Sequence, residues 1–190
     1  GDALAVARLL AEEGYSVSAY LFNIGNRLSD DCMANKKRAM ECKRMREFVE
    51  VTTQLDPPEL PSGTVVIDGI FGSGLNKPLA GGFASLVKYI NQSRAKVISI
   101  DIPSGLMTED NTYNVSVNII RADVTLTLQS KKLSFLFADC QQYIGKLKVI
   151  DIRLSNEYIM KTEARYYVTE EADITRRIKS RDDFAPKGTM

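Results

Sequence analysis

The 190-residue chain contains no histidine. This absence excludes a Ser-His-Asp triad, a Cys-His pair and histidine-bound zinc. Proton transfer would therefore fall to Asp, Glu, Lys, Tyr or water. The cysteines are Cys32, Cys42 and Cys140, which are too few and too scattered for a disulfide framework or a zinc site. Any metal ion would be held by oxygen ligands, and this use of cysteine is typical of a reducing cytoplasm.

The sequence also lacks an excess of charge and any long apolar run. Lys and Arg number 25 and Asp and Glu 24, which gives a net charge of +1. Such a balance gives no reason to expect nucleic acid or an anionic membrane as a partner. Apolar runs reach about six residues, far short of the roughly 20 that span a bilayer. No export signal is visible at the start, so we expect a cytoplasmic protein.

What the chain does contain is a series of short apolar runs separated by helical patterns. Strands are expected at residues 15–22, 48–51, 64–68, 96–101, 122–128 and 146–152, and helices at 1–14, 30–48 and 82–91. Runs such as Val65-Val66-Ile67 are apolar on both faces, as in a sheet that helices cover. The pattern predicts an α/β fold that is Rossmann-like and doubly wound, with a mainly parallel sheet and helices on both faces.

The expected helices carry recognisable ends and faces. Gly14 is expected at the C-terminal end of the first helix, whose apolar side would hold Ala3, Val6, Ala7 and Leu10. Ser29 is expected to cap the second helix, with Met33 and Met40 on its apolar side.

The character of the sequence changes near Tyr158. The rest holds one short helical pattern, with Thr169 as the expected N-cap, and ends in a polar Pro/Gly segment. The first helix has no strand before it. We therefore expect a domain at residues 1–157, truncated at its start, and at 158–190 a linker followed by the start of another truncated domain.

Two of the expected strands end in carboxylates that precede unusual loops. Asp68 leads into the glycine-rich segment 69–78, and Asp101 leads into Ile-Pro-Ser-Gly. In an open α/β sheet, ligands bind beyond the carboxyl ends of the strands. Glycines leave room for an oxyanion to meet backbone N–H groups, and Lys77 adds a positive charge that suits phosphate. The two loops predict a crevice for a phosphate-bearing ligand and a hard monovalent or divalent cation.

Structural explanations for the same residues remain open. The glycine-rich segment is neither a Walker loop nor the dinucleotide fingerprint, so it could be only a tight turn. Asp68 could cap a turn and Asp101 could form an Asx turn. Lys131 and Lys132 follow a strand and could face the crevice, although a solvated turn is the favoured expectation.

Four segments in this order resemble the NAD(P)H-hydrate epimerase family, the N-terminal half of bifunctional nicotinamide-nucleotide repair enzymes. They are VIDGIFGSGLNKPL, SIDIPSGL, ADVTLTLQSKKLSFLF and GKLKVIDIRL, and the resemblance covers Gly1 to Leu154. It implies a Rossmann-like fold, a potassium site and homodimers. The final RDDFAPKGTM resembles the entrance to the fused ATP- or ADP-dependent dehydratase domain of that family.

The resemblance also implies roles for individual residues. Asp101 would touch the hydrated nicotinamide and act as the acid/base. The substrate, chiefly its phosphates, would be bound by Gly72, Ser73, Gly74, Leu75, Asn76, Lys77 and Pro78, with Gly1 and Asp2 ending a further family loop. Asp68 and Ser104 would hold potassium. An asparagine that completes the potassium site, and the first strand of the sheet, would precede Gly1.

The implied reaction suits a chain without histidine. Hydrated NADH or NADPH (NADHX or NADPHX) carries a hydroxyl beside the ring nitrogen, and one carboxylic acid suffices to assist its departure and return. The resemblance therefore implies an epimerase of the R and S hydrates within a bifunctional epimerase/dehydratase. Two alternatives remain, a redox enzyme with an NAD-type cofactor and a non-catalytic nucleotide- or protein-binding module on the same scaffold.

Overall fold

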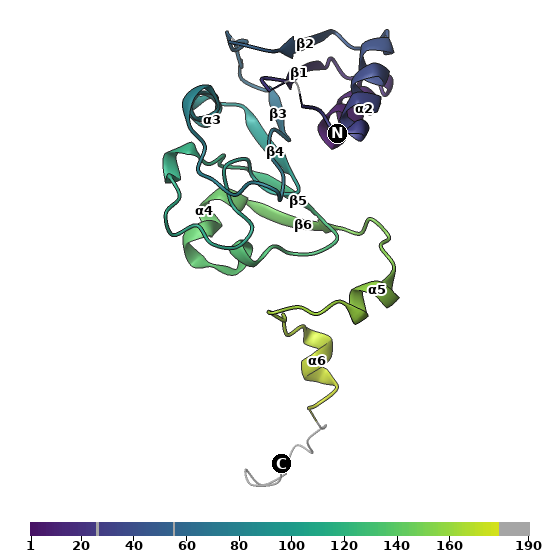
Figure 1. The fold of residues 1–190 in the computed structure, drawn as a ribbon, viewed down its shortest axis with the longest axis vertical. Helices are drawn as coiled ribbons and strands as arrows, with labels where there is room; N and C mark the ends of the chain where they lie inside the picture. The colour runs from purple at the N-terminus through teal and green to yellow at the C-terminus, as the bar shows by residue number, and fades with distance from the viewer. Residues whose placement is uncertain (26, 55, 179–190) are drawn as a thin grey trace. The chain divides into compact units, whose positions relative to one another are not determined.

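The computed structural model describes residues 1–25, 27–54 and 56–178 (Figure 1). The chain divides into two compact units, one from Gly1 to Arg153 and one from Leu154 onward. No helix among the described residues has the length and hydrophobicity needed to cross a membrane.

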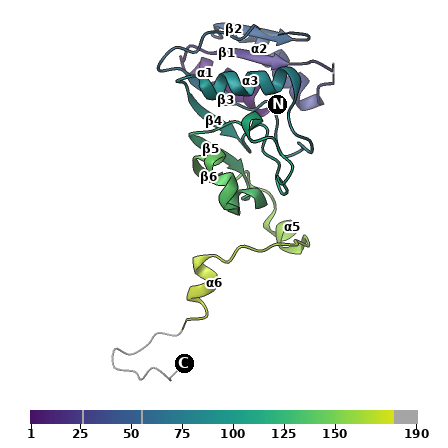
Figure 2. The same cartoon turned by 90° about the vertical axis from the view of Figure 1, so that its left-hand side faces the viewer.

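The first unit is built on two parallel sheets. One pairs β1 (Ser18–Phe22) with β2 (Glu47–Val51). The other has the order β3-β4-β5-β6, and Figure 2 shows its strands following one another in this order. Its strands are β3 (Val65–Asp68), β4 (Lys96–Ile100), β5 (Val124–Leu128) and β6 (Lys146–Ile150). All these pairings are parallel, which confirms the predicted α/β fold, although the strands form two sheets.

The strand at residues 64–68 is less buried than predicted. β3 lies at one edge of its sheet, with β4 as its strand neighbour in the described part of the chain. Val65 is 50% exposed, and Val66 and Ile67 are only partly buried. The expectation that this strand is buried on both faces is therefore wrong, and the edge position of β3 explains the exposure of Val65. Asp68, the last residue of β3, is the buried one.

The helix α1 (Asp2–Glu12) precedes β1, α2 (Asp30–Glu41) connects β1 to β2, and α3 (Gly81–Gln92) connects β3 to β4. Gly14 follows α1 with φ +95° and its N–H donates to the Ala11 carbonyl, so the predicted C-terminal glycine is confirmed. The predicted apolar side of α1 is displaced, because its buried residues are Leu4 and Ala11. The side predicted from Ala3, Val6, Ala7 and Leu10 is only partly buried.

The prediction for α2 is right at its start and wrong at its end. The Ser29 hydroxyl accepts the N–H of Cys32 at 3.2 Å, as a cap should. The helix stops at Glu41 and not near residue 48, because residues 47–51 are recruited into pairing with β1. Met33 and Met40 are exposed, while Cys32 and Ala39 face the interior, so the predicted apolar side is also wrong.

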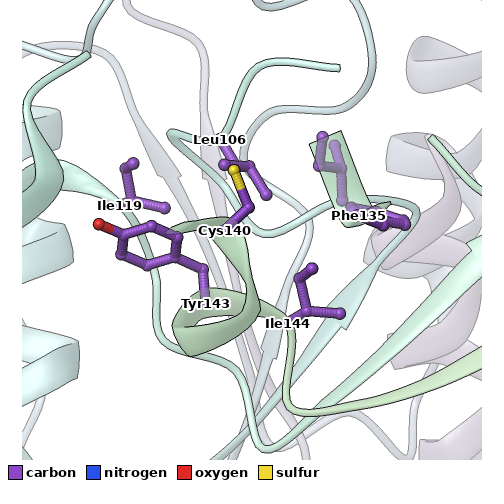
Figure 3. Close-up of a cluster of buried hydrophobic side chains, with 7 residues drawn as sticks. Leu106, Ile119, Phe135, Cys140, Tyr143 and Ile144 are labelled. Atoms are coloured by element: carbon purple, nitrogen blue, oxygen red, sulfur yellow. The ribbon is translucent and has the colours of Figure 1, made fainter. Parts of the chain in front are cut away.

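One core cluster includes residues of the loop that follows β4. Figure 3 shows six of its seven side chains by name. The cluster comprises Ile102, Leu106, Ile119, Phe135, Cys140, Tyr143 and Ile144, the last two from the short helix α4 (Gln141–Ile144). Ile102 and Leu106 flank residues 103–105 and are 0% and 1% exposed. Their burial anchors both ends of this loop and fixes the position of the residues between them.

The second unit contains α5 (Asn156–Lys161) and α6 (Glu171–Thr175), and all its described residues are exposed. The sequence predicted only one helix here, so α5 was missed. The N-cap of α6 is Glu170, whose N–H donates to Asp173 Oδ2 at 3.1 Å, so the prediction of Thr169 is wrong. RDDFAPKGTM lies outside the described residues, and the assignment of 158–190 to a linker and a second domain stays a prediction.

Candidate active site

Asp68 and Asp101 lie at the carboxyl ends of neighbouring parallel strands. In the β3–β4 register, Asp68 is paired with Ser99, and Asp101 directly follows the last residue of β4. Both carboxylates therefore emerge at the same edge of the sheet, where α/β proteins bind ligands. Their environments differ sharply, and each carboxylate holds a different loop.

Asp68 is a buried carboxylate with four hydrogen-bond donors. Its Oδ2 accepts the Ser99 hydroxyl and the Ser104 N–H, both at 2.8 Å, and its Oδ1 accepts the Ser104 hydroxyl at 2.5 Å and the Ile70 N–H at 3.4 Å. Burial raises the pKa of Asp68, against the lowering effect of these hydrogen bonds. Among the described residues, no Lys or Arg forms an ion pair with it.

Ser104 joins the two loops. Its hydroxyl oxygen accepts the Phe71 N–H at 3.0 Å while it donates to Asp68. The Phe71 ring also packs edge-on against Phe83 of α3, with 4.9 Å between ring centroids. The base of the glycine-rich loop is therefore held on one side by the β4 loop and on the other by α3.

The rest of the glycine-rich loop faces solvent. Gly72, Ser73, Gly74, Asn76, Lys77 and Pro78 are exposed, and Leu75 is partly buried in the core cluster of α3. The Leu75 N–H donates to the Gly72 carbonyl at 3.3 Å and closes a turn. A Cβ added at Gly74 would meet no described atom within 4 Å, and φ there lies outside the left-handed range. The fold itself thus gives no reason for a glycine at this position.

Asp101 has a strained backbone and two unequal carboxylate oxygens. Its φ is +66°, and the Ile102 N–H donates to the Ile100 carbonyl at 2.9 Å across it, which forms a γ-turn. Its Oδ1 accepts the Leu128 N–H at 3.3 Å and pairs with Lys132 Nζ at 2.7 Å. A Cβ added at Gly72 would lie 3.9 Å from Oδ2, so this oxygen is near the glycine-rich loop.

The expectation that Lys132 lies in a solvated turn is wrong. Its side chain is only 15% exposed and is paired with Asp101. The reason is that β5 lies beside β4, so the turn after β5 comes next to the turn after β4. Nothing in the local sequence distinguishes Lys132 from Lys131. Only the pairing of the two expected strands 96–101 and 122–128 could have indicated that Lys132 lies next to Asp101.

Gly1 and Asp2, which are predicted to bind substrate, lie close to the start of the glycine-rich loop. A Cβ added at Gly69 would fall 2.7 Å from the Ala3 Cβ, so the first turn of α1 packs on the residue that follows Asp68. Gly1 and Asp2 are exposed next to this contact. The structure therefore gathers the predicted site residues around one edge of the sheet, while their roles stay predictions.

A parallel α/β domain with its candidate ligand loops at the carboxyl ends of the strands belongs to the Rossmann-like class. Residues 1–134 match the family model described as YjeF-related protein N-terminus. The chain belongs to this family.

Named relatives agree with this membership. The chain is 32% identical over 151 residues to the NAD(P)H-hydrate epimerase of Limosilactobacillus fermentum, and 34% identical over 152 residues to that of Lentilactobacillus buchneri. Each match covers 80% of this chain, and 68% and 66% of the respective relatives. A bifunctional NAD(P)H-hydrate repair enzyme, Nnr, of Thermofilum pendens is 35% identical over 150 residues, which is 78% of this chain and 28% of that enzyme. The chain thus spans only part of each relative.

Proposed function

We propose that this chain is an NAD(P)H-hydrate epimerase domain, which interconverts the R and S forms of hydrated NADH and NADPH. The observation that carries the proposal is the position of Asp101, whose Oδ2 lies near Gly72 of an exposed glycine-rich loop. The carboxyl group lies beside a loop whose exposed residues would bind the dinucleotide. The names of the epimerase relatives give the reaction class.

The reaction needs one proton donor and acceptor near the reacting carbon. The hydrated ring is a hemiaminal, in which the ring nitrogen can expel the neighbouring hydroxyl once that hydroxyl receives a proton. Asp101 would donate this proton, so that water leaves, and would take a proton back when water adds to the opposite face. The net change is inversion at one carbon, with no oxidant or reductant. A single carboxyl group is sufficient for both steps.

Binding energy would come from the glycine-rich loop, away from the reacting carbon. Lys77 and the backbone N–H groups of residues 72–74, 76 and 77 suit the phosphates of a dinucleotide, since Pro78 has no N–H and that of Leu75 is donated to the Gly72 carbonyl. Gly74 has open space around the position of its missing Cβ, which allows a phosphate to approach the backbone. Contacts remote from the ring would hold the ring against Asp101.

Asp68 and Ser104 are the residues that would hold potassium. Both offer oxygen, which hard cations prefer, and Asp68 is a buried carboxylate without a cationic partner among the described residues. No three His, Cys, Asp or Glu side chains gather as metal ligands in the described chain, so further ligands would be neutral oxygens. A bound K+ would supply positive charge that offsets the burial of Asp68 and would stabilise the junction of the two loops.

The wider setting of the domain is also a proposal. We expect homodimers, a cytoplasmic location, and a fused ATP- or ADP-dependent dehydratase (a lyase) in the complete protein. The bifunctional name of the Thermofilum pendens relative, of which this chain matches 28%, supports the fused domain.

The test is direct measurement of epimer interconversion by the complete protein that contains this sequence. One purified hydrate epimer is incubated with and without K+, and the R and S forms are separated chromatographically. The proposal expects interconversion faster than the spontaneous rate. A spontaneous rate combined with tight binding of the hydrates would favour the binding module. Oxidation of NADPH in the presence of carbonyl compounds would favour the redox enzyme.

A further inference from the structure

We propose that Lys132 is the positioning residue of Asp101, which it holds by one oxygen so that the other faces the glycine-rich loop. The inference rests on the proposed function, because it concerns the proposed acid/base. Lys132 lies 31 positions after Asp101 and is distinct from Lys77, the lysine of the glycine-rich loop.

The ammonium group of Lys132 is fully engaged inside the protein. Nζ lies 2.7 Å from Asp101 Oδ1 and donates to the carbonyl oxygens of Leu128 at 3.2 Å and Ser130 at 3.3 Å. An ammonium has three N–H donors, so these three acceptors use all of them. The side chain is 15% exposed. Lys132 therefore contacts Asp101 and has no N–H left to bind a phosphate.

This arrangement makes the two oxygens of Asp101 unequal. Oδ1 accepts from Lys132 and from the Leu128 N–H, while Oδ2 lies 3.9 Å from the position that a Cβ would take at Gly72. When the carboxyl group carries a proton, Oδ1 can keep both donors as a carbonyl oxygen. The proton then belongs on Oδ2, the oxygen near the proposed substrate loop. Rotation of the carboxyl group, which would point the proton away from the loop, would break both contacts to Oδ1.

Lys132 also ties together two strained turns. Asp101 and Gln129 both have positive φ, at +66° and +61°. Each is the centre of a γ-turn, closed by Ile102 N–H to Ile100 O at 2.9 Å and by Ser130 N–H to Leu128 O at 2.7 Å. These turns follow the neighbouring strands β4 and β5. One lysine contacts the side chain from the first turn and both carbonyls of the second, and strain of this kind persists only where surrounding contacts hold it.

The test compares Lys132→Met with Lys132→Arg and with the control Lys131→Met in the complete protein. Lys131 is the exposed neighbour on the same turn. We expect Lys132→Met to lower kcat for epimer interconversion about 10- to 100-fold with little change in KM, since misplacement of a reacting group costs this much. Lys132→Arg should retain part of the kcat that Lys132→Met loses, and Lys131→Met should leave kcat and KM unchanged.

A double mutant separates positioning from general damage. If Lys132 acts through Asp101, Lys132→Met should cost no further activity in the Asp101→Asn background. An equal further loss there, an effect on KM alone, or an unchanged kcat in the single variant would each overturn the inference. If Lys132→Met does not fold, Lys132→Arg carries the same comparison, with a smaller loss that must also vanish in the Asp101→Asn background.

A spectroscopic readout keeps this inference separate from the proposed function. The carboxyl carbon resonance of Asp101, assigned by its loss in Asp101→Asn, should move in Lys132→Met and stay in place in Lys131→Met. An inactive wild-type protein would refute the epimerase, whereas an unmoved Asp101 resonance would refute the role of Lys132, whatever the activity.

Discussion

The carboxylate of Asp68 accepts both the backbone N–H and the hydroxyl of Ser104, which lies 36 positions later in the chain. The same hydroxyl oxygen accepts the N–H of Phe71, at the base of the glycine-rich loop. The end of β3, the loop after it and the loop after β4 therefore share one buried polar junction. Because such a junction is costly when one partner is lost, it can be tested by single-atom changes.

Ser104→Ala should destabilise the protein more than Ser99→Ala. Ser104 contributes a hydroxyl to Asp68 and an acceptor to Phe71, whereas the Ser99 hydroxyl contributes one bond to Asp68. We expect a loss of about 2–3 kcal/mol in unfolding free energy for Ser104→Ala and about 1 kcal/mol for Ser99→Ala. Urea unfolding followed by circular dichroism measures both.

Ser104→Ala should also weaken substrate binding, because Phe71 loses its tie to the β4 loop. We expect KM for the hydrates to rise in Ser104→Ala and to stay near the wild-type value in Ser99→Ala. Equal KM values in the two variants would show that the junction serves stability alone.

Gly74→Ala should affect activity and not folding. The added methyl group has open space, and φ at this position is outside the left-handed range. The unfolding free energy should change by no more than about 0.5 kcal/mol, as for an ordinary surface change. If backbone at this position approaches a phosphate, the methyl group would obstruct it and raise KM at least several-fold, which steady-state kinetics would detect.

Gly105→Ala, the control for Gly74→Ala, should impair folding. A Cβ at Gly105 would lie 2.3 Å from the Asn118 carbonyl oxygen, and φ there is +98°. Backbone strain alone would cost roughly 1–3 kcal/mol of unfolding free energy. Gly105→Ala should cost more than this, because the added Cβ also clashes with the carbonyl oxygen. If Gly74→Ala lost as much unfolding free energy as Gly105→Ala, the assignment of Gly74 to ligand binding would be contradicted.

Potassium should stabilise the protein, and more so above the raised pKa of Asp68 than below it. Burial raises the pKa of Asp68, so the folded state binds its proton more tightly than the unfolded state does. The resulting stability is fully present below the ordinary Asp pKa and is lost as the pH rises through the raised value. Above that value the carboxylate is charged and buried, and a cation beside it offsets the cost.

Thermal unfolding in KCl and in a chloride of a larger organic cation, at several pH values, measures this effect. Saturation at a hundred times Kd would stabilise by about 2.7 kcal/mol. The K+ effect should vanish in Asp68→Asn. A K+ effect that is independent of pH and persists in Asp68→Asn would place the ion elsewhere.

Much of the architecture could be predicted because its signals are local. Buried strands such as β4 and β5 appear as short apolar runs, and the Ser29 cap and Gly14 follow directly from helix-end chemistry. The convergence of Asp68 and Asp101 also follows from sequence, since parallel strands end at a common edge.

The errors concern features that tertiary pairing decides. The end of α2 depends on β2 pairing with β1, which no helical pattern in residues 42–48 reveals. The exposure of Val65 depends on β3 lying at an edge. The partnership of Lys132 with Asp101 depends on β5 lying beside β4, and the two donors that Ser104 gives Asp68 depend on where the β4 loop folds back.

The most direct test of the account is the rate at which Asp101→Asn interconverts the R and S hydrates. Asn tolerates the positive φ at this position, so the variant should unfold near the wild-type temperature. Loss of the acid/base should lower the interconversion rate at least about 100-fold. A folded Asp101→Asn protein that interconverts the epimers as fast as the wild type would contradict the proposed function of this site.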